Sequence, residues 1–183
     1  MNKLEKSLQQ APIIDRGTYR YVVHPITDGI PAIEPALLEE VTERMQCELP
    51  DCDRIVTTEA MGIPIAAALS LRTGIPFTII RKRSYGLPGE VFVEQVTGYS
   101  SSELYINGLK DGDEVVLVDD VVSTGGTLIA VMAALRDMGV TVKKILVAVS
   151  KGDLPAIEEQ VGMPINTLVD IAVNDGVEIR TRH

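Results

Sequence analysis

Two adjacent carboxylates, followed by a cluster of hydroxyl residues and glycines, suggest where this chain does its chemistry. Asp119 and Asp120 come directly after an aliphatic run, and the cluster opens a stretch with helical spacing. Glycines at a helix N-terminus let an anion approach unpaired backbone N–H groups at the positive end of the helix dipole, and hydroxyls add donors. The pattern therefore predicts a site for a phosphate monoester. The cluster consists of Ser123, Thr124, Gly125, Gly126 and Thr127.

The two aspartates would repel that phosphate unless they face another group, and we expect them to accept hydrogen bonds from sugar hydroxyls. Two other phosphate motifs are excluded by their residues. No Gly-Lys-Ser/Thr ends the loop, as a Walker A site requires, and no G-x-G-x-x-G follows a strand. An ordinary strand-to-helix turn with acidic capping residues is the alternative interpretation.

The segments around this motif predict an alternation of strands and helices. Residues 115–118 form a continuous aliphatic run, typical of a strand buried on both faces, and residues 128–138 have helical spacing before Gly139. The alternation predicts an α/β fold with a doubly wound, mostly parallel sheet that binds ligands beyond the carboxyl ends of its strands. We expect further strands at 54–58, 76–80, 90–96, 144–149, 166–172 and 177–180, and helices at 36–47, 64–72 and 154–161.

Length, composition and charge limit the classes of protein. The chain has 183 residues, 45% apolar content and a net charge of −9, which suits one domain spanning 1–183 and disfavours a nucleic-acid or membrane surface. The polar N-terminus does not resemble a signal peptide and no apolar stretch approaches transmembrane length, so we expect a cytoplasmic protein. Cys47 and Cys52 have no neighbouring histidine or cysteine, and we expect them to be free thiols.

Three consecutive cations stand out in this acidic chain. Arg81, Lys82 and Arg83 follow the strand predicted at 76–80. Such a cluster can bind a pyrophosphate leaving group, although an isolated basic triplet is usually a solvated charge run. Their position at the end of a strand favours the functional interpretation.

Three segments resemble those of a known family. VVLVDDVVSTGGT (115–127) resembles the phosphoribosyl pyrophosphate signature of type I phosphoribosyltransferases, and RKRSYGLPGE (81–90) is similar to a stretch of the adenine-specific members. HPITDGIP (24–31) most resembles the archaeal hypoxanthine/guanine members, and the resemblance extends from Leu4 to the end of the chain. It implies the type I phosphoribosyltransferase fold with an N-terminal hood, residues 1–34, and a flexible flap, residues 84–107.

The resemblance assigns roles to these residues. Asp119 and Asp120 would hold the ribose hydroxyls, the Ser123–Thr127 loop would hold the 5′-phosphate, and Arg81 and Lys82 would meet the pyrophosphate. Backbone amides of the loop at 57–62 would wrap the same pyrophosphate, and a cis peptide would join Glu59 to Ala60 in that loop. Adenine enzymes commonly carry Arg at the position of Met61, whereas the loop of xanthine enzymes is closer to this one.

The resemblance also indicates residues near the base. His24 and Asp28 of the hood could contact it, with a packed histidine and a turn-capping aspartate as alternatives. Lys151 can donate but not accept a hydrogen bond, so it favours a 6-oxo group over the 6-amino group of adenine. It matches the lysine after the same strand in xanthine enzymes, and a surface lysine is the alternative interpretation.

In the flap, residues 95–106 align with the flexible loop of the adenine enzymes. The alignment places Tyr99 on the tyrosine of that loop and implies a catalytic role for it in closing the site. A tyrosine packed in a surface hairpin is the alternative. Gly98 stands where the loop has a glutamate, so this chain would do without that group or use Glu94 or Glu103.

The function that the resemblance implies is purine salvage. The enzyme would transfer a 5-phosphoribosyl group from phosphoribosyl pyrophosphate to hypoxanthine or guanine, giving IMP or GMP and pyrophosphate. An adenine or xanthine enzyme and a non-catalytic regulator that senses phosphoribosyl pyrophosphate are the alternatives. Mg²⁺ is the implied cofactor, held mainly by substrate and water with Asp119 as the candidate protein ligand. The implied assembly is a homodimer, without nucleic-acid or membrane partners.

Overall fold

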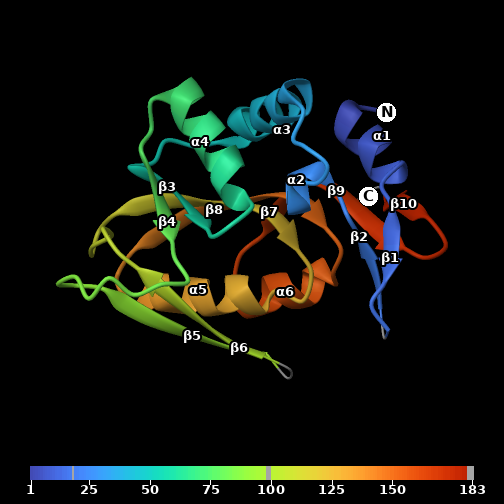
Figure 1. Ribbon diagram of the computed structural model, residues 1–183. Helices are drawn as coiled ribbons and strands as arrows, with labels where there is room; N and C mark the ends of the chain where they lie inside the picture. The colour runs from blue at the N-terminus through green and yellow to red at the C-terminus, as the bar shows by residue number, and fades with distance from the viewer. Residues whose placement is uncertain (18, 98–99, 181–183) are drawn as a thin grey trace.

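The chain folds around a six-stranded sheet with helices on both faces (Figure 1). The computed structural model describes residues 1–17, 19–97 and 100–180. The strand order is β10-β9-β8-β7-β3-β4, and neighbours pair in parallel except β10, which is antiparallel to β9. The strands are β3 (Arg54–Thr58), β4 (Phe77–Ile80), β7 (Glu114–Val122), β8 (Thr141–Ser150), β9 (Ile165–Val173) and β10 (Val177–Arg180).

Each face of the sheet is covered by a pair of helices. In Figure 1, α3 (Pro35–Glu48) and α4 (Gly62–Thr73) lie above the sheet, and α5 (Gly126–Asp137) and α6 (Leu154–Val161) lie below it. Successive residues of a strand point to opposite faces. In β7, Val116 and Val118 therefore pack in the core cluster that includes residues of α3 and α4, whereas Val115 and Leu117 pack in the cluster on the α5 and α6 side. Burial on both faces explains why this strand is continuously aliphatic.

The N-terminal region contains more regular structure than the sequence predicted. Its elements are α1 (Lys3–Gln9), β1 (Ile13–Asp15), β2 (Arg20–Val22) and α2 (Pro25–Asp28), with β1 and β2 paired antiparallel. The sequence had indicated a hood over residues 1–34 without predicting any regular element in it, so α1 was missed. Leu4 and Leu8 are fully buried in the core, so tertiary packing stabilises a helix too short to persist alone.

The flap region forms a hairpin beside the main sheet. Strands β5 (Val91–Thr97) and β6 (Ser100–Ile106) pair antiparallel, and β5 packs against α5. The hairpin is tied to the end of β4, because the backbone N–H of Arg81 donates to the carbonyl of Tyr105 and the N–H of Tyr105 donates back to Arg81. Buried Val93, Leu104 and Ile106 attach it to the core. The flexibility of the flap stays a prediction.

The predicted elements agree with the structure where hydrophobic patterns were clear. The bounds predicted for β3, α6 and β10 match, and Gly139 has the predicted left-handed backbone, with φ of +73°. The strand predicted at 115–118 was too short, because β7 continues through both aspartates to Val122. None of the helices in the described part of the chain has the length and apolar character needed to cross a bilayer.

Candidate active site

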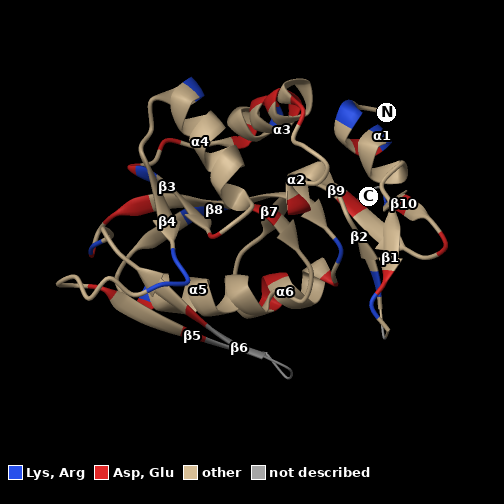
Figure 2. Ribbon diagram, viewed as in Figure 1, with Lys and Arg blue, Asp and Glu red and all other residues tan. Residues whose placement is uncertain are grey.

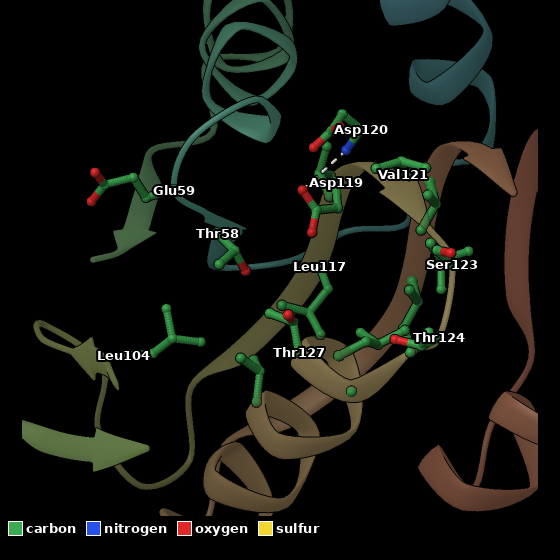
Figure 3. Close-up of a pocket in the computed structure, with 18 of the residues that line it drawn as sticks. Thr58, Glu59, Leu104, Leu117, Asp119, Asp120, Val121, Ser123, Thr124 and Thr127 are labelled. Atoms are coloured by element: carbon green, nitrogen blue, oxygen red, sulfur yellow. Dashed lines mark hydrogen bonds between the residues drawn. The ribbon is translucent and has the colours of Figure 1, made fainter. Parts of the chain in front are cut away.

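The predicted phosphate loop lies at the N-terminus of α5 and borders a cavity. Gly125 precedes the helix with φ of +77°, a conformation that glycine adopts without strain, and no side chain caps the first N–H groups of α5. The cavity has a volume of about 270 Å³. Its lining includes the whole loop, Ser123, Thr124, Gly125, Gly126 and Thr127, and both aspartates (Figure 3). Free N–H groups, hydroxyls and a positive helix end therefore face one cavity.

The acid pair stands at the end of β7 beside this loop. In Figure 3 the carboxylate of Asp119 points toward the cavity, and its Oδ1 accepts a hydrogen bond of 3.0 Å from the backbone N–H of Asp120. Burial raises the pKa of both carboxyl groups, and the neighbouring Asp119 charge raises the pKa of Asp120 further. Two neighbouring buried acids are poorly stabilised as anions, and sugar hydroxyls or a bound cation would stabilise their charge.

The basic cluster approaches the cavity from the end of β4. Figure 2 shows basic residues on the chain that leaves β4 toward the β5–β6 hairpin. Lys82 lines the cavity together with Glu59 and Ala60 from the loop after β3, and the peptide bond between Glu59 and Ala60 is cis, as the resemblance implied. Arg81 does not line the cavity.

Glu59 holds the basic cluster in place. Arg81 donates from Nε to Glu59 Oε2 at 2.8 Å, and the backbone N–H of Lys82 donates to the same oxygen at 3.2 Å. The N–H of Lys82, followed by the Arg81 guanidinium, lowers the pKa of Glu59. The loop after β3 and the segment after β4 are thus joined at the mouth of the cavity.

The residues predicted to contact the base meet one another outside this cavity. Lys151 Nζ lies 4.8 Å from the centroid of the Tyr21 ring, and the Tyr21 hydroxyl donates to Asp28 Oδ1 at 2.5 Å. Burial, and then the hydrogen bond to Asp28, raises the pKa of Tyr21 to about 12, so its hydroxyl stays protonated at neutral pH. Burial lowers the pKa of Lys151. The sequence had not indicated Tyr21, although an aromatic residue in the hood was a visible signal.

His24 lies in the hood with both ring nitrogens engaged. Its side chain is 0% exposed, Nδ1 accepts from the backbone N–H of Ile26 at 3.2 Å, and Nε2 lies 2.9 Å from Ser7 Oγ. Because Nδ1 accepts, Nε2 carries the proton and donates to Ser7. Burial lowers the pKa of His24 to about 4, so the ring is neutral. The structure therefore agrees with the alternative interpretation of His24 as a packed histidine, and a contact of His24 with the base stays a prediction.

Asp28 has the contacts of an organising residue. Its carboxylate accepts from the Tyr21 hydroxyl, from Thr27 Oγ1 at 2.6 Å and from the backbone N–H of His24 at 2.9 Å. These contacts fit the capping alternative, and the charge of Asp28 also acts on Lys151. A direct contact of Asp28 with the base stays a prediction.

The predicted flap residues are only partly described. Gly98 and Tyr99 lie outside the described residues, so the role of Tyr99 stays a prediction. Glu94 and Glu103 are paired across β5 and β6, and both are exposed. Glu103 Oε2 accepts from the Tyr105 hydroxyl at 2.7 Å. Neither glutamate lines the cavity.

The residues around the cavity fit a magnesium ion that is held mainly by its substrate. Among the described residues, no group of three or more histidines, cysteines and acids could hold a metal ion by itself. The Asp119 carboxylate faces the cavity, beside a loop built for phosphate, and carboxylate oxygen is a ligand that Mg²⁺ accepts. Asp119 would thus contribute one protein oxygen to an ion otherwise bound by phosphate, sugar and water.

A doubly wound sheet with an acid pair, a phosphate loop and a basic segment at one edge defines a phosphoribosyltransferase. The model of the family described as "Phosphoribosyl transferase domain" matches residues 48–161, and the chain belongs to that family. Its fold is that of adenine phosphoribosyltransferase structures. The enzyme from Thermoanaerobacter pseudethanolicus superposes with a TM-score of 0.75 at 24% identity, covering 92% of this chain and 99% of that one.

Relatives of known name cover nearly the whole chain. The hypoxanthine/guanine phosphoribosyltransferase of Methanothermobacter thermautotrophicus is 53% identical over 178 residues, covering 96% of this chain and 92% of that protein. The protein of the same name from Methanocaldococcus infernus is 55% identical over 177 residues, covering 95% and 97%. This chain is similar to both, and the archaeal hypoxanthine/guanine resemblance seen in the sequence is confirmed.

Proposed function

We propose that this protein is a purine-salvage enzyme that transfers the 5-phosphoribosyl group of phosphoribosyl pyrophosphate to hypoxanthine or guanine. The observation that carries the proposal is the shared cavity of the acid pair and the phosphate loop, bordered by Lys82. One substrate supplies a group for each part: ribose hydroxyls for the acids, a 5′-phosphate for the loop and a pyrophosphate for the cations. The names of the archaeal relatives support the choice of base.

In the proposed reaction, N9 of the base attacks C1′ of the ribose as the bond from C1′ to the pyrophosphate oxygen breaks. The pyrophosphate leaves with the electron pair, and the N9 proton of the base passes to solvent. Positive charge develops on the sugar and negative charge on the leaving group. Asp119 and Asp120 would hold the ribose and stabilise its developing charge, while Lys82 and Arg81 would stabilise the pyrophosphate.

Bound Mg²⁺ would supply positive charge at the pyrophosphate oxygens, with Asp119 as its candidate protein ligand. The loop from Ser123 to Thr127 would fix the 5′-phosphate through backbone N–H groups at the start of α5. Lys151 would donate to the 6-oxo group of the base, with Tyr21 and Asp28 holding the ammonium in place. A Tyr99 on the flap would exclude water, which competes with the base as nucleophile.

We further propose a homodimer in the cytoplasm, as the family resemblance implies. The decisive experiment incubates the purified protein with phosphoribosyl pyrophosphate, Mg²⁺ and one base at a time, and measures nucleotide formation by chromatography. IMP and GMP without AMP are expected. AMP alone would make it an adenine enzyme, XMP alone a xanthine enzyme, and binding of phosphoribosyl pyrophosphate without any nucleotide would make it a sensor.

A further inference from the structure

One buried hydroxyl beside the acid pair has no role in the site as described so far. Thr57 is 1% exposed, near the end of β3, and its Oγ1 is buried without a hydrogen-bond partner among the described residues. A buried hydroxyl without a partner costs about 1–3 kcal/mol, so most such groups are paired. An unpaired one next to a ligand cavity indicates a partner that is engaged in another state of the site.

Asp119 is a candidate partner, as the geometry at Gly62 shows. Gly62 is the first residue of α4, and a Cβ at this position would lie 2.7 Å from Asp119 Oδ1 and closer still to Thr57 Oγ1. Thr57 Oγ1 and Asp119 Oδ1 thus both lie close to the position of this Cβ. The distance between the two oxygens cannot exceed the sum of these two short distances. Only a glycine leaves room for both groups against the start of the helix.

The start of α4 adds a second reason for an anion at this place. No side chain caps the first N–H groups of α4, and its first turn contains no acidic residue. The positive end of a helix favours a negative charge within its first turn. The carboxylate of Asp119, delivered from β7, is the acidic group next to Gly62, so it is the group that the positive end of α4 would stabilise.

We propose that Thr57 is a positioning residue for Asp119: its hydroxyl donates to Asp119 Oδ1 when substrate is bound and so turns the other oxygen toward the ribose hydroxyls and the metal. The inference rests on the proposed function, since it concerns the ribose-binding role of Asp119. It explains why a threonine and a glycine stand at these two positions, one supplying the donor and the other supplying the space.

The test compares three variants with wild type. Thr57→Val keeps the shape and removes the donor, whereas Thr57→Ser keeps the donor. Thr42→Val is the matched control, because Thr42 is also 1% exposed and its hydroxyl bonds the Leu38 carbonyl within α3. Should Thr57→Val fail to fold, Thr57→Ala against Thr57→Ser makes the same comparison.

Two readouts separate positioning from a structural role. Turnover of Thr57→Ser should stay close to that of wild type, because serine keeps the hydroxyl that donates to Asp119. In turnover, Thr57→Val should lower kcat about ten-fold with a smaller change in KM, and should move the acidic limb of the pH profile upward. All variants keep the charged groups that share the cavity with Asp119, namely Glu59, Lys82 and Asp120, and the groups whose charges interact with Asp120, namely Asp28 and Lys151.

The outcomes are distinct. An unchanged kcat and pH profile in Thr57→Val overturns the inference, and so does an equal loss of kcat in Thr42→Val, which would assign the effect to a loosened core. A wild-type protein that forms no nucleotide from any base would overturn the proposed function instead. Calorimetric binding of phosphoribosyl pyrophosphate with Mg²⁺ still decides the role of Thr57 in that case, because binding should be weaker in Thr57→Val than in Thr57→Ser and equal binding would overturn the inference.

Discussion

Arg81 Nε lies 2.8 Å from Glu59 Oε2, so a cation proposed to bind pyrophosphate is paired with a carboxylate of the neighbouring loop. Both side chains are partly exposed, and such a pair contributes little to stability. The ion pair instead fixes positions, because it holds the segment after β4 next to the loop after β3. Substrate pyrophosphate would compete with Glu59 for the same guanidinium.

Arg81→Ala should therefore weaken substrate binding without destabilising the fold. We expect a KM for phosphoribosyl pyrophosphate about ten-fold higher, since charge-assisted hydrogen bonds to phosphate are strong, and an unchanged KM for the base. Steady-state kinetics with each substrate varied in turn measures both. Arg83→Ala is the control, because it removes the same charge from a guanidinium that also lies over the Tyr85 ring, at 5.8 Å against 6.0 Å for Arg81, whereas the ion pair with Glu59 is made by Arg81. Equal effects in the two variants would argue for a general charge effect instead of a specific contact.

Asp120→Asn should raise stability while it lowers turnover. The pKa of Asp120 is higher in the folded state than its ordinary value of 3.8, so the folded protein binds this proton more tightly than the unfolded chain. Stability of the wild type therefore falls as pH rises above about 4 through that window. An asparagine does not titrate, so the Tm advantage of the variant should be absent near pH 4 and grow toward neutral pH.

At pH 7.5 we expect a Tm gain of about 2–4 °C, which corresponds to about 1 kcal/mol in a chain of this size. In the same variant, kcat should fall roughly 100-fold, as when one preorganised transition-state contact is removed. Thermal unfolding across pH and turnover at saturating substrate measure the two effects. Full activity in Asp120→Asn would remove the ribose-binding role, and a Tm loss at neutral pH would contradict the raised pKa of the buried Asp120 carboxyl.

Gly152→Ala should displace the phosphate loop, because the added methyl group would press on the loop backbone. A Cβ on Gly152 would overlap the Ser123 carbonyl, whose carbon would be 2.9 Å away, and would lie 3.3 Å from Ile157 Cδ1. The obstacle is backbone, so the loop itself must shift. We expect a KM for phosphoribosyl pyrophosphate about ten-fold higher and a lower Tm. Gly176→Ala is the matched control, since a Cβ there meets nothing within 4 Å, and similar kinetics in both variants would contradict the argument.

The parts of the site that lie close together in the chain could be predicted from the sequence. The acid pair and the phosphate loop span only residues 119–127, and the strand and helix around them have clear hydrophobic patterns. The elements whose formation depends on distant packing could not be predicted as well. Helix α1 had a visible signal, the Asn2–Glu5 capping box, but burial of Leu4 and Leu8 stabilises it.

Contacts between segments far apart in the chain could not be predicted from motifs or hydrophobic patterns. Lys151 was predicted near the base, yet its place over the Tyr21 ring depends on how the hood lies against the end of β8. The convergence of Thr57, Gly62 and Asp119 likewise brings together β3, α4 and β7. The sequence indicates which residue types could form the site. How close these residues lie to one another depends on the packing of the sheet and its helices.

Lys151→Met should remove the preference for 6-oxopurines. Methionine keeps the apolar stem and loses the donor, and a hydrogen bond from a charged group contributes about 1.5–3 kcal/mol, so kcat/KM for hypoxanthine should fall about 10- to 100-fold. Inhibition by adenine, whose 6-amino group cannot accept that bond, should not weaken. Competition assays with the two bases measure the ratio directly.

Tyr21→Phe tests whether the Lys151 ammonium or the hydrogen bonds of the hood around it determine the base preference. Phenylalanine keeps the ring 4.8 Å beneath Lys151 but loses the bond to Asp28, so it should retain the base preference even if the hood is less firmly held. Loss of preference in Tyr21→Phe but not in Lys151→Met would move selectivity from the lysine to the hood. Loss in Lys151→Met alone would place it on the ammonium, because a donor that cannot accept distinguishes an oxo group from an amino group.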